Sequence, residues 1–374
     1  MEKYNSLKVF FGGIEVGTLA LYKSSLCAFE YSAEWLETGW SISPYSLPLK
    51  RKVFIPNYDP FDGLFGVFED SLPDGWGRLL VDRLLLSRGE KPETVGPLTR
   101  LAIVGSSGMG ALSYRPELQL MTEKQTTDYD RFAEECHRLL NTDYSDNLDE
   151  LFALGGSSGG ARPKILTELD GEDWIIKFPA SGDRKDIGLM EYEYTRCAEK
   201  CGIDVSPCRL FDAKNCEGYF GTKRFDREPD STGGKQRIHM ISASGLLETS
   251  HRVPALDYNS LMKLTLQLTK DYSEVEKLYR LMCFNVFAHN RDDHSNNFSF
   301  LFKNGKWHLA PAYDLTYSFS LGGEHATCVN GNGKNPGLAE LLAVAEKTGL
   351  NRTRSMEAAQ AIRETVNTDL GKYL

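Results

Sequence analysis

Two acidic side chains and one amide in the last third of the chain have the types and the spacing that phosphoryl transfer requires. Asp292 and Asn297 stand five positions apart in an Asp-x-His-x-x-Asn string, with His294 between them. Phosphoryl transfer needs a carboxylate that orients the attacking hydroxyl and accepts its proton, and it needs oxygen ligands for Mg²⁺. Because Asp292 and Asn297 have the spacing found in the catalytic loops of kinases, this segment predicts such a loop.

A second carboxylate must hold the metal ion against the phosphates, and Asp314 is placed for that task. The expected strands 298–302 and 307–309 are separated by an Asn-Gly pair, which is a strong signal for a tight hairpin. Such a hairpin would bring Asp314 back beside Asn297. The sequence therefore predicts two metal ligands separated by one short hairpin.

The phosphates of a nucleotide require positive charge and backbone donors. Lys177 stands on an expected strand between apolar neighbours, and Glu191 lies at the start of the next expected helix. Because a buried lysine without a partner is costly, Glu191 is the expected partner of Lys177. The glycine-rich segment 155–160 offers backbone N–H groups, those of Gly159 and Gly160 among them, that could approach phosphate oxygens.

Each of these features also has an ordinary structural explanation. A glycine-rich segment is most often a plain turn, Lys177 could be a solvent-facing residue of an edge strand, and Asp314 could cap a helix. The order along the chain is the glycine-rich segment, the lysine, the glutamate, the Asp-x-His-x-x-Asn string and then the last aspartate. Because all five features occur in the order found in kinases, a phosphoryl-transfer site explains them better than five unrelated structural roles.

The elements that must position these residues indicate an α+β protein with a strand-rich first half and a helix-rich second half. Residues 7–31 alternate as a hairpin followed by another strand, and residues 71–88 carry the apolar stripe of a helix. Ser273 and Glu276 predict a capping box for one of the later helices. These later helices are expected at 258–270, 273–289, 337–348 and 354–367. The polar stretch 121–128 is the expected linker, and the predicted parts are 1–120, 121–237 and 238–374.

The bulk properties narrow the function classes. The net charge of −9 over 374 residues argues against a general nucleic-acid binder, because such binding requires clustered lysine and arginine. The eight cysteines include no Cys-x-x-Cys pair, so a zinc site has weak support. The N-terminus has no signal pattern, and no apolar run approaches membrane length. We therefore expect a cytoplasmic, reduced protein with no membrane partner and no direct nucleic-acid contact.

Motifs over nearly the whole chain are similar to those of one family. The N-terminal motifs are Gly12–Gly17, Trp35-Leu36, Ser46–Leu49 and Phe68–Gly75, and the features described above follow them. With these motifs the chain resembles the HipA family of serine/threonine kinases, the toxin halves of bacterial toxin–antitoxin pairs. The resemblance implies a two-lobed protein-kinase-like fold, related to lipid-kinase-like folds. It implies an extra N-terminal subdomain over 1–120, a kinase N-lobe over 121–237 and a helical C-lobe over 238–374.

The resemblance also implies roles for single residues with ATP and Mg²⁺ as cofactors. Asp292 would be the catalytic base, Asn297 and Asp314 would hold Mg²⁺, and Lys177 would contact the α- and β-phosphates. His294 would lie near the phosphates. Adenine would contact the backbone of Lys223 and Phe225 in the hinge 223–225, with Asp226 near the ribose. This chain has Lys223 where the family usually has glutamate, which matters little if the contact uses backbone atoms.

The family's glycine-rich loop carries a serine whose autophosphorylation ejects the loop and silences the kinase. Ser157 matches that position and Ser158 is adjacent to it. A phosphate would add a charge of about −2 beside the ATP phosphates, and repulsion explains the inactivation. The alternative is that both serines only serve a turn. A further glycine-rich stretch, 322–334, follows Asp314 and is expected to be a loop that gates access of the substrate.

Three functions compete. The first is an active protein kinase whose substrate is a protein of the translation machinery, an aminoacyl-tRNA synthetase by family resemblance, with a small DNA-binding antitoxin as partner. The second is an inactive kinase-like binding module that docks such an antitoxin. The third is a kinase for a small molecule or lipid. The intact set of Lys177, Asp292, Asn297 and Asp314 disfavours the second, and the family-like N-terminal segment disfavours the third.

Overall fold

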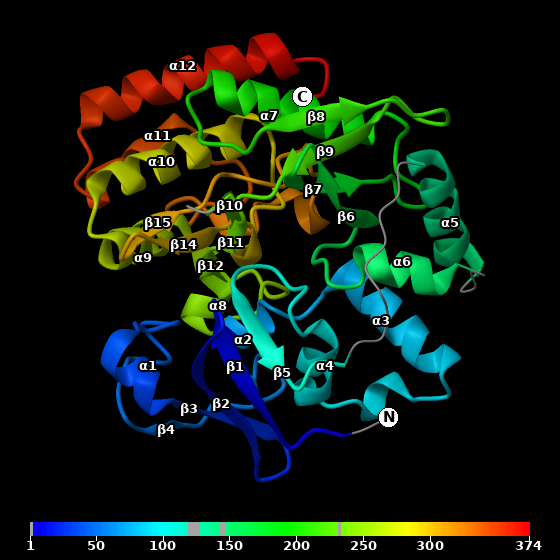
Figure 1. Cartoon of the computed structure of the whole chain (residues 1–374). Coiled ribbons are helices and arrows are strands. Elements are labelled where there is room, and N and C mark those ends of the chain that lie inside the picture. The colour runs from blue at the N-terminus through cyan, green and yellow to red at the C-terminus, as the bar shows by residue number, and fades with distance from the viewer. Residues whose placement is uncertain (1–2, 119–127, 143–146, 231–232) are drawn as a thin grey trace. The chain divides into compact units, whose positions relative to one another are not determined.

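The computed structural model describes residues 3–118, 128–142, 147–230 and 233–374 (Figure 1). The expected linker 121–128 lies outside these ranges except for its last residue. The chain forms two compact units. The first comprises Met1–Asp186, Phe211–Ile241 and Gly245–Thr249, and the second comprises Ile187–Leu210, Ser242–Ser244 and Ser250–Leu374. No helix in the described ranges combines the length and the apolar character needed to span a bilayer.

The first unit begins with an antiparallel sheet in the strand order β4-β3-β2-β1-β5. Its strands are β1 (Ser6–Phe11), β2 (Ile14–Tyr22), β3 (Leu26–Tyr31), β4 (Val53–Phe54) and β5 (Leu112–Arg115). The turn between β1 and β2 is Gly12-Gly13, with Phe11 opposite Ile14, so the predicted hairpin and third strand are confirmed. The helices of this region are α1 (Ala33–Thr38), α2 (Gly66–Glu69), α3 (Gly75–Ser87) and α4 (Pro97–Val104).

A second sheet of the first unit carries Lys177, and the glycine-rich segment 155–160 leads from α6 toward its first strand. Strand β7 (Glu172–Lys177) pairs antiparallel with β6 (Lys164–Leu169) on one side and with β9 (Tyr219–Lys223) on the other. Two helices, α5 (Tyr129–Thr142) and α6 (Leu148–Gly155), precede the sheet in the chain. They share one apolar core with the sheet and with α3, a helix of the N-terminal region. Buried members of that core are Trp76, Leu80, Phe132, Leu139, Leu151, Leu154, Ile165, Ile176, Phe178 and Tyr219.

The remaining elements of the first unit follow β9. The segment 229–236, expected to be an exposed loop, is flanked by a short hairpin of β10 (Arg227–Pro229) and β11 (Lys235–Arg237), and its residues 231–232 lie outside the described ranges. Strand β12 (His239–Ser242) and helix α8 (Ala243–Leu247) follow where the chain passes between the units. Strand β8 (Cys208–Phe211) precedes β9, at the point where the chain returns to the first unit.

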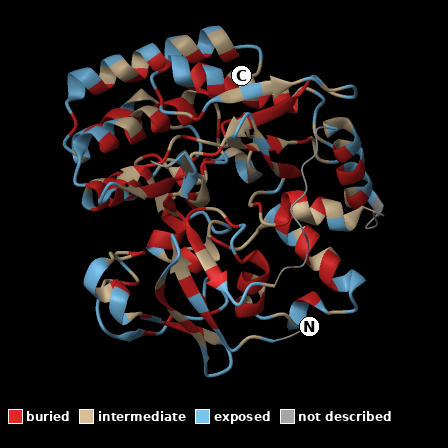
Figure 2. Ribbon diagram, in the orientation of Figure 1, coloured by how far each residue is buried: buried red, intermediate tan, exposed pale blue. Residues whose placement is uncertain are grey.

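The second unit is mostly helical, as predicted. Its helices are α7 (Ile187–Lys200), α9 (Tyr258–Thr269), α10 (Tyr272–Phe287), α11 (Leu338–Lys347) and α12 (Arg352–Leu370). Burial is confined to one stripe of α12, formed by Ser355, Ala359, Ile362, Val366 and Leu370, and its outer face is exposed (Figure 2). The predicted capping box at Ser273 is wrong, because Asp271 caps α10 by accepting the N–H of Ser273. The expected mixed α+β fold class is confirmed.

Candidate active site

The predicted hairpin between the two metal ligands is present in the second unit. Strand β14 (Ser299–Lys303) pairs antiparallel with β15 (Lys306–Leu309), with Lys303 opposite Lys306. The turn residues Asn304 and Gly305 both have positive φ, as a tight hairpin turn requires. The pairing continues past the strands, because the N–H of Ala310 donates to the carbonyl of Ser299 at 2.8 Å. The chain therefore returns from β15 toward the start of β14.

A hydrogen bond links the residues that precede the two predicted ligands. The hydroxyl of Tyr313 donates to the carbonyl of Asn296 at 2.5 Å, and Tyr313 also shares a 2.7 Å hydrogen bond with Ser299. Asn297 and Asp314 are the next residues along the chain on either side of this bond. Asp314 has a φ of +54°, a conformation that Asp adopts more readily than most residues. The metal role of Asn297 and Asp314 stays a prediction.

The expected catalytic loop follows α10. The side-chain N–H₂ of Asn297 donates to the backbone carbonyl of Asp292 at 2.7 Å, which leaves its amide oxygen for other ligands. The side chain of Asp292 is 62% exposed and lies 3.8 Å from Nε2 of His294. The rings of His294 and His251 lie 5.3 Å apart. The carboxylate of Asp292 is thus largely exposed to solvent.

The next residue, Asp293, anchors the loop. Its carboxylate accepts hydrogen bonds from the hydroxyl of Tyr258 at 2.9 Å and from the N–H of Thr327 at 3.1 Å, and it lies 3.0 Å from Nδ1 of His325. The side chain of Asp293 is fully buried. The sequence predicted no role for Asp293 or His325. The second aspartate of the Asp292-Asp293 string is thus a structural residue, which the sequence alone did not separate from the first.

The segment after Asp314 is hydrogen-bonded at two points to the expected catalytic loop. The N–H of Ser318 donates to the carbonyl of His289, and the N–H of Ala326 donates to the carbonyl of Arg291, both at 3.1 Å. Strand β16 (Thr327–Cys328) then pairs in parallel with β13 (Leu256–Asp257). The segment between these bonds carries Phe319, whose surface is 74% exposed. The expected loop 322–334 therefore begins beside the catalytic loop, and its role as a gate stays a prediction.

Several buried polar atoms of the catalytic loop have no hydrogen-bond partner in the described part of the structure. They are Oδ1 of Asn290, Nε of Arg291, Nδ1 of His294 and Oδ1 of Asn296. A buried polar atom without a partner typically costs about 1–3 kcal/mol, so these atoms require water or a bound ligand as partners. Within the described ranges, no group of three or more His, Cys, Asp or Glu side chains could hold a metal ion. The donor set of one amide and one carboxylate fits Mg²⁺ that takes its other ligands from phosphates and water.

In the first unit, the glycine-rich segment follows α6 directly. The hydroxyl of Ser158 donates to the carbonyl of Gly155 at 2.5 Å, and Ser158 is only 2% exposed. Ser157 is half-buried. The carbonyl of Gly159 accepts a hydrogen bond from Nζ of Lys164, and the N–H of Gly160 donates to Asp74. The segment is therefore a folded loop with specific anchors.

Two lysines lie directly opposite each other beside this loop. Lys164 at the start of β6 is the cross-strand partner of Lys177 at the end of β7. Like charges at directly opposed positions destabilise a sheet unless partners of opposite polarity lie nearby. Nζ of Lys177 lies 5.7 Å from the centre of the Phe220 ring. The sequence did not predict a role for Lys164, although it ends the glycine-rich motif.

Glu191, the expected partner of Lys177, is a buried residue of α7 in the second unit, whereas Lys177 belongs to the first. The hinge residues follow β9. Nζ of Lys223 forms an ion pair with Glu172, and the N–H of Arg224 donates to the carbonyl of Asp173 at 2.8 Å. The pairing of Lys177 with Glu191 and the adenine contacts of Lys223 and Phe225 stay predictions.

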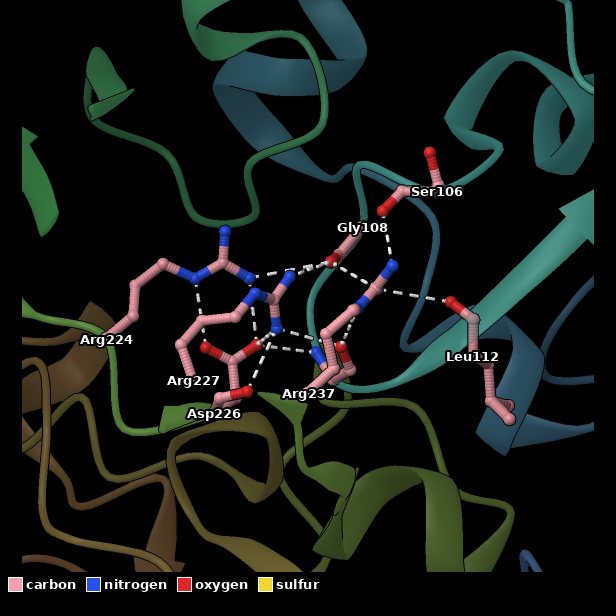
Figure 3. A network of polar contacts seen from close by, with 8 residues as sticks. Ser106, Gly108, Leu112, Arg224, Asp226, Arg227 and Arg237 are labelled. Carbon is pink, nitrogen blue, oxygen red and sulfur yellow. Dashed lines mark hydrogen bonds and ion pairs between the residues drawn. The ribbon is translucent and has the colours of Figure 1, made fainter. Parts of the chain in front are cut away.

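Asp226 is engaged in a buried network of arginines (Figure 3). Its carboxylate receives two hydrogen bonds from Arg224, at 2.9 and 2.8 Å, and one each from Arg227 at 2.8 Å and the Gly110 N–H at 2.7 Å. Burial alone would raise the pKa of Asp226, but Arg224 and the other donors outweigh it and lower the pKa to about 2. The side chain is fully buried, which disfavours the expected ribose contact.

The same arginines hold the segment 106–112 against the hinge. Arg237 donates to the carbonyls of Gly108 at 3.0 Å and Gly110 at 2.9 Å, and Arg227 donates to the same two carbonyls. Figure 3 shows the side chains of Arg227 and Arg237 reaching the Gly108 carbonyl from two sides. The network therefore ties the N-terminal region to the hinge within the first unit.

Comparison with known proteins agrees with this architecture. The chain has the fold of the HipA protein in a solved Shewanella oneidensis complex of HipA, HipB and operator DNA, with a TM-score of 0.74, 17% identity and coverage of 98% of this chain and 90% of that one. A Helicobacter pylori kinase, CtkA, matches 55% of this chain and 90% of its own at 12% identity, with a TM-score of only 0.35. A Sinorhizobium fredii protein named as a candidate kinase, Y4mE, is 27% identical over 345 residues, which are 83% of this chain and 76% of that protein.

Two family models match most of the chain. The model of the HipA N-terminal domain matches residues 7–115, and the model of the HipA-like C-terminal domain matches residues 156–370. The C-terminal match alone covers more than half of the 374 residues. The chain belongs to the HipA family, and the expected protein-kinase-like fold is confirmed.

Proposed function

We propose that this chain is a serine/threonine protein kinase that uses ATP and Mg²⁺. The observation that carries the proposal is the loop 289–297, which combines the exposed carboxylate of Asp292, the hydrogen-bonded amide of Asn297 and several buried polar atoms without a partner. The nitrogen atoms among them, from Arg291 and His294, suit phosphate oxygens, whereas the amide oxygens of Asn290 and Asn296 suit water or a metal ion. Membership of the HipA family and the candidate-kinase name of Y4mE support the same class of reaction.

In this proposal Asp292 orients the acceptor hydroxyl and accepts its proton. Asn297 and Asp314 would hold Mg²⁺, which when bound supplies positive charge to the transferring phosphoryl group. Lys177, with Lys164 opposite, neutralises the α- and β-phosphates, and His294 lies near them. Glu191 orients Lys177. The backbones of Lys223, Phe225 and Gly159 would contact the nucleotide, whereas the N–H of Gly160, also expected to do so, donates to Asp74 instead. Asp226 positions the hinge through Arg224.

The substrate and partner follow from the family. We propose a protein of the translation machinery as substrate, with an aminoacyl-tRNA synthetase as the first candidate, and autophosphorylation in the loop 155–160. A solved relative forms a complex with HipB and operator DNA, which supports a small DNA-binding antitoxin as the partner. The reaction is placed in the cytoplasm, and neither a membrane nor direct contact with nucleic acid is part of the proposal.

Two alternative functions can be separated from this proposal by experiment. An inactive kinase-like module would bind an antitoxin without turnover, and a kinase for a small molecule or lipid would transfer phosphate to a non-protein acceptor. Incubation of the purified chain with Mg²⁺, labelled ATP and a cell lysate tests the proposal against both. Label on a protein, lost in Asp292→Asn, supports it. Label on a small molecule alone, or ATP binding without any transfer, overturns it.

A further inference from the structure

The glycine-rich loop 155–160 is docked on the start of α3, a helix of the matched N-terminal domain. The N–H of Trp76 donates to the carbonyl of Gly160 at 3.0 Å, and the N–H of Gly160 donates to Oδ1 of Asp74. Both backbone polar groups of Gly160 are thus bonded to residues of one short segment, Asp74–Trp76. The loop is therefore held by a part of the chain that is distant in sequence.

The peptide group that joins Gly159 to Gly160 is held at both ends. Its carbonyl oxygen, from Gly159, accepts a hydrogen bond from Nζ of Lys164, and its N–H, from Gly160, donates to Asp74. Asp74 occupies the N-cap position of α3, yet its side chain makes no cap hydrogen bond to that helix. An aspartate at this position normally stabilises its own helix by accepting such a bond. Here the carboxylate binds the loop instead.

The loop and the helix start also fit closely in shape. A Cβ atom on Gly75, which has a φ of +45°, would lie 2.5 Å from the carbonyl oxygen of Gly160. A Cβ atom on Gly77 would lie 2.1 Å from the carbonyl oxygen of Ser158. Real Cβ atoms do not approach oxygen so closely, so only glycine permits this docking at both positions. The contact is specific in geometry as well as in hydrogen bonding.

We infer that Asp74 is a positioning residue that latches the glycine-rich loop in place for nucleotide binding. The carboxylate fixes the Gly160 N–H and so fixes the path of the loop beside Lys164 and Lys177. In this docked loop the Ser158 hydroxyl is buried and donates to Gly155, so any reaction of that hydroxyl requires it to leave this hydrogen bond. The nucleotide part of this inference rests on the proposed function, whereas the latch itself does not.

Hydrogen exchange of the full chain without nucleotide tests the latch. In Asp74→Ala, peptides covering 155–164 exchange about tenfold faster, the factor expected from losing about 1.4 kcal/mol of protection. Asp74→Asn keeps an acceptor oxygen and retains most of the protection. The matched control is Asp82→Ala on the same helix, where Asp82 pairs with Arg100 at 2.8 Å, and it leaves exchange of 155–164 unchanged. Unchanged exchange in a folded Asp74→Ala protein overturns the inference.

A second variant keeps the test possible if Asp74→Ala does not fold, and kinase assays give a second readout. Gly77→Ala places a methyl group against Ser158 and speeds exchange of the same peptides, so it decides the matter if Asp74→Ala does not fold. In kinase assays, Asp74→Ala raises KM for ATP about tenfold while kcat stays near the parent value. A fall in kcat with unchanged KM contradicts a positioning role. If the parent chain transfers no phosphate, the proposed function fails, while the exchange result still decides the latch.

Discussion

Asp292 and Asp293 are neighbours in the chain, yet their side chains lie in opposite environments. The side chain of Asp292 is 62% exposed, whereas that of Asp293 is fully buried between Tyr258 and His325. An exposed carboxylate can meet a substrate, and a buried one must be paired within the protein. If Asp292 is the proposed catalytic base, the pair separates catalysis from folding within one dipeptide.

Conservative substitution of each aspartate tests this separation. Asp292→Asn lowers kcat by about a hundredfold or more because the proton acceptor is lost, and it leaves the melting temperature unchanged. Asp293→Asn weakens the hydrogen bonds to Tyr258 and Thr327, and it lowers the free energy of unfolding by about 1–3 kcal/mol. Phosphoryl-transfer assays and thermal unfolding measure both effects. A large loss of stability in Asp292→Asn would contradict the assignment.

Lys177 and Lys223 provide a matched pair for nucleotide binding. Lys177→Gln removes one of two opposed charges, so the affinity for ATP falls about tenfold or more. The side chain of Lys223 pairs with Glu172, and the proposed adenine contact uses its backbone. Lys223→Gln therefore changes ATP affinity less than threefold, within the range of a surface ion pair. Calorimetric titration with ATP compares the two variants, and equal losses would contradict the proposed roles.

The buried His239 predicts a pH dependence of stability. Burial lowers its pKa from 6.5 to about 4, although the hydrogen bond to the Ile42 carbonyl opposes the shift. The folded pKa of His239 lies below the unfolded value, so the unfolded chain takes up a proton more readily. The stability gained by burying the neutral imidazole is therefore fully present above pH 6.5 and is lost as the pH falls toward 4. The loss amounts to about 3 kcal/mol. Urea unfolding at pH 7 and pH 4.5 should show a smaller difference for His239→Gln than for the parent chain.

The two serines of the glycine-rich loop differ in exposure. Ser157 is half-buried, whereas the hydroxyl of Ser158 is buried and donates to Gly155. We therefore expect Ser157 to carry the phosphate after autophosphorylation in the latched state. Mass spectrometry of the protein after incubation with ATP and Mg²⁺ locates the phosphate. Ser157→Ala should abolish the early modification, and phosphate found on Ser158 first would show that the loop opens before the reaction.

Features that depend on local sequence could be predicted. The Asn304-Gly305 turn and the alternation of flanking residues were sufficient to predict the β14–β15 hairpin, because a tight hairpin is set by its turn residues. The helices after residue 240 follow from apolar periodicity in the same way. The helix cap was predicted wrongly, because Ser273 and Asp271 are both good capping residues and the sequence does not say which one the fold selects.

Features that depend on partners distant in sequence could not be predicted. Asp226 looked suited to a ribose, but the structure buries it against Arg224 and the Gly110 N–H. Asp74 stands at the N-cap of α3, where an aspartate usually binds its own helix, yet it binds Gly160. In each case the aspartate side chain indicated that a polar contact was present. The identity of the partner was fixed only by the packing of the N-terminal region with the strands that follow it.

The most direct test of the proposed function is transfer of phosphate by the purified chain. The chain is incubated with Mg²⁺ and γ-labelled ATP, alone and with a cell lysate, beside Asp292→Asn and Asp293→Asn. The proposal predicts label on the peptide that contains Ser157 and on a lysate protein, with both signals absent in Asp292→Asn and present in folded Asp293→Asn. Measurable ATP binding with no label on either protein would contradict it and would identify the chain as a binding module.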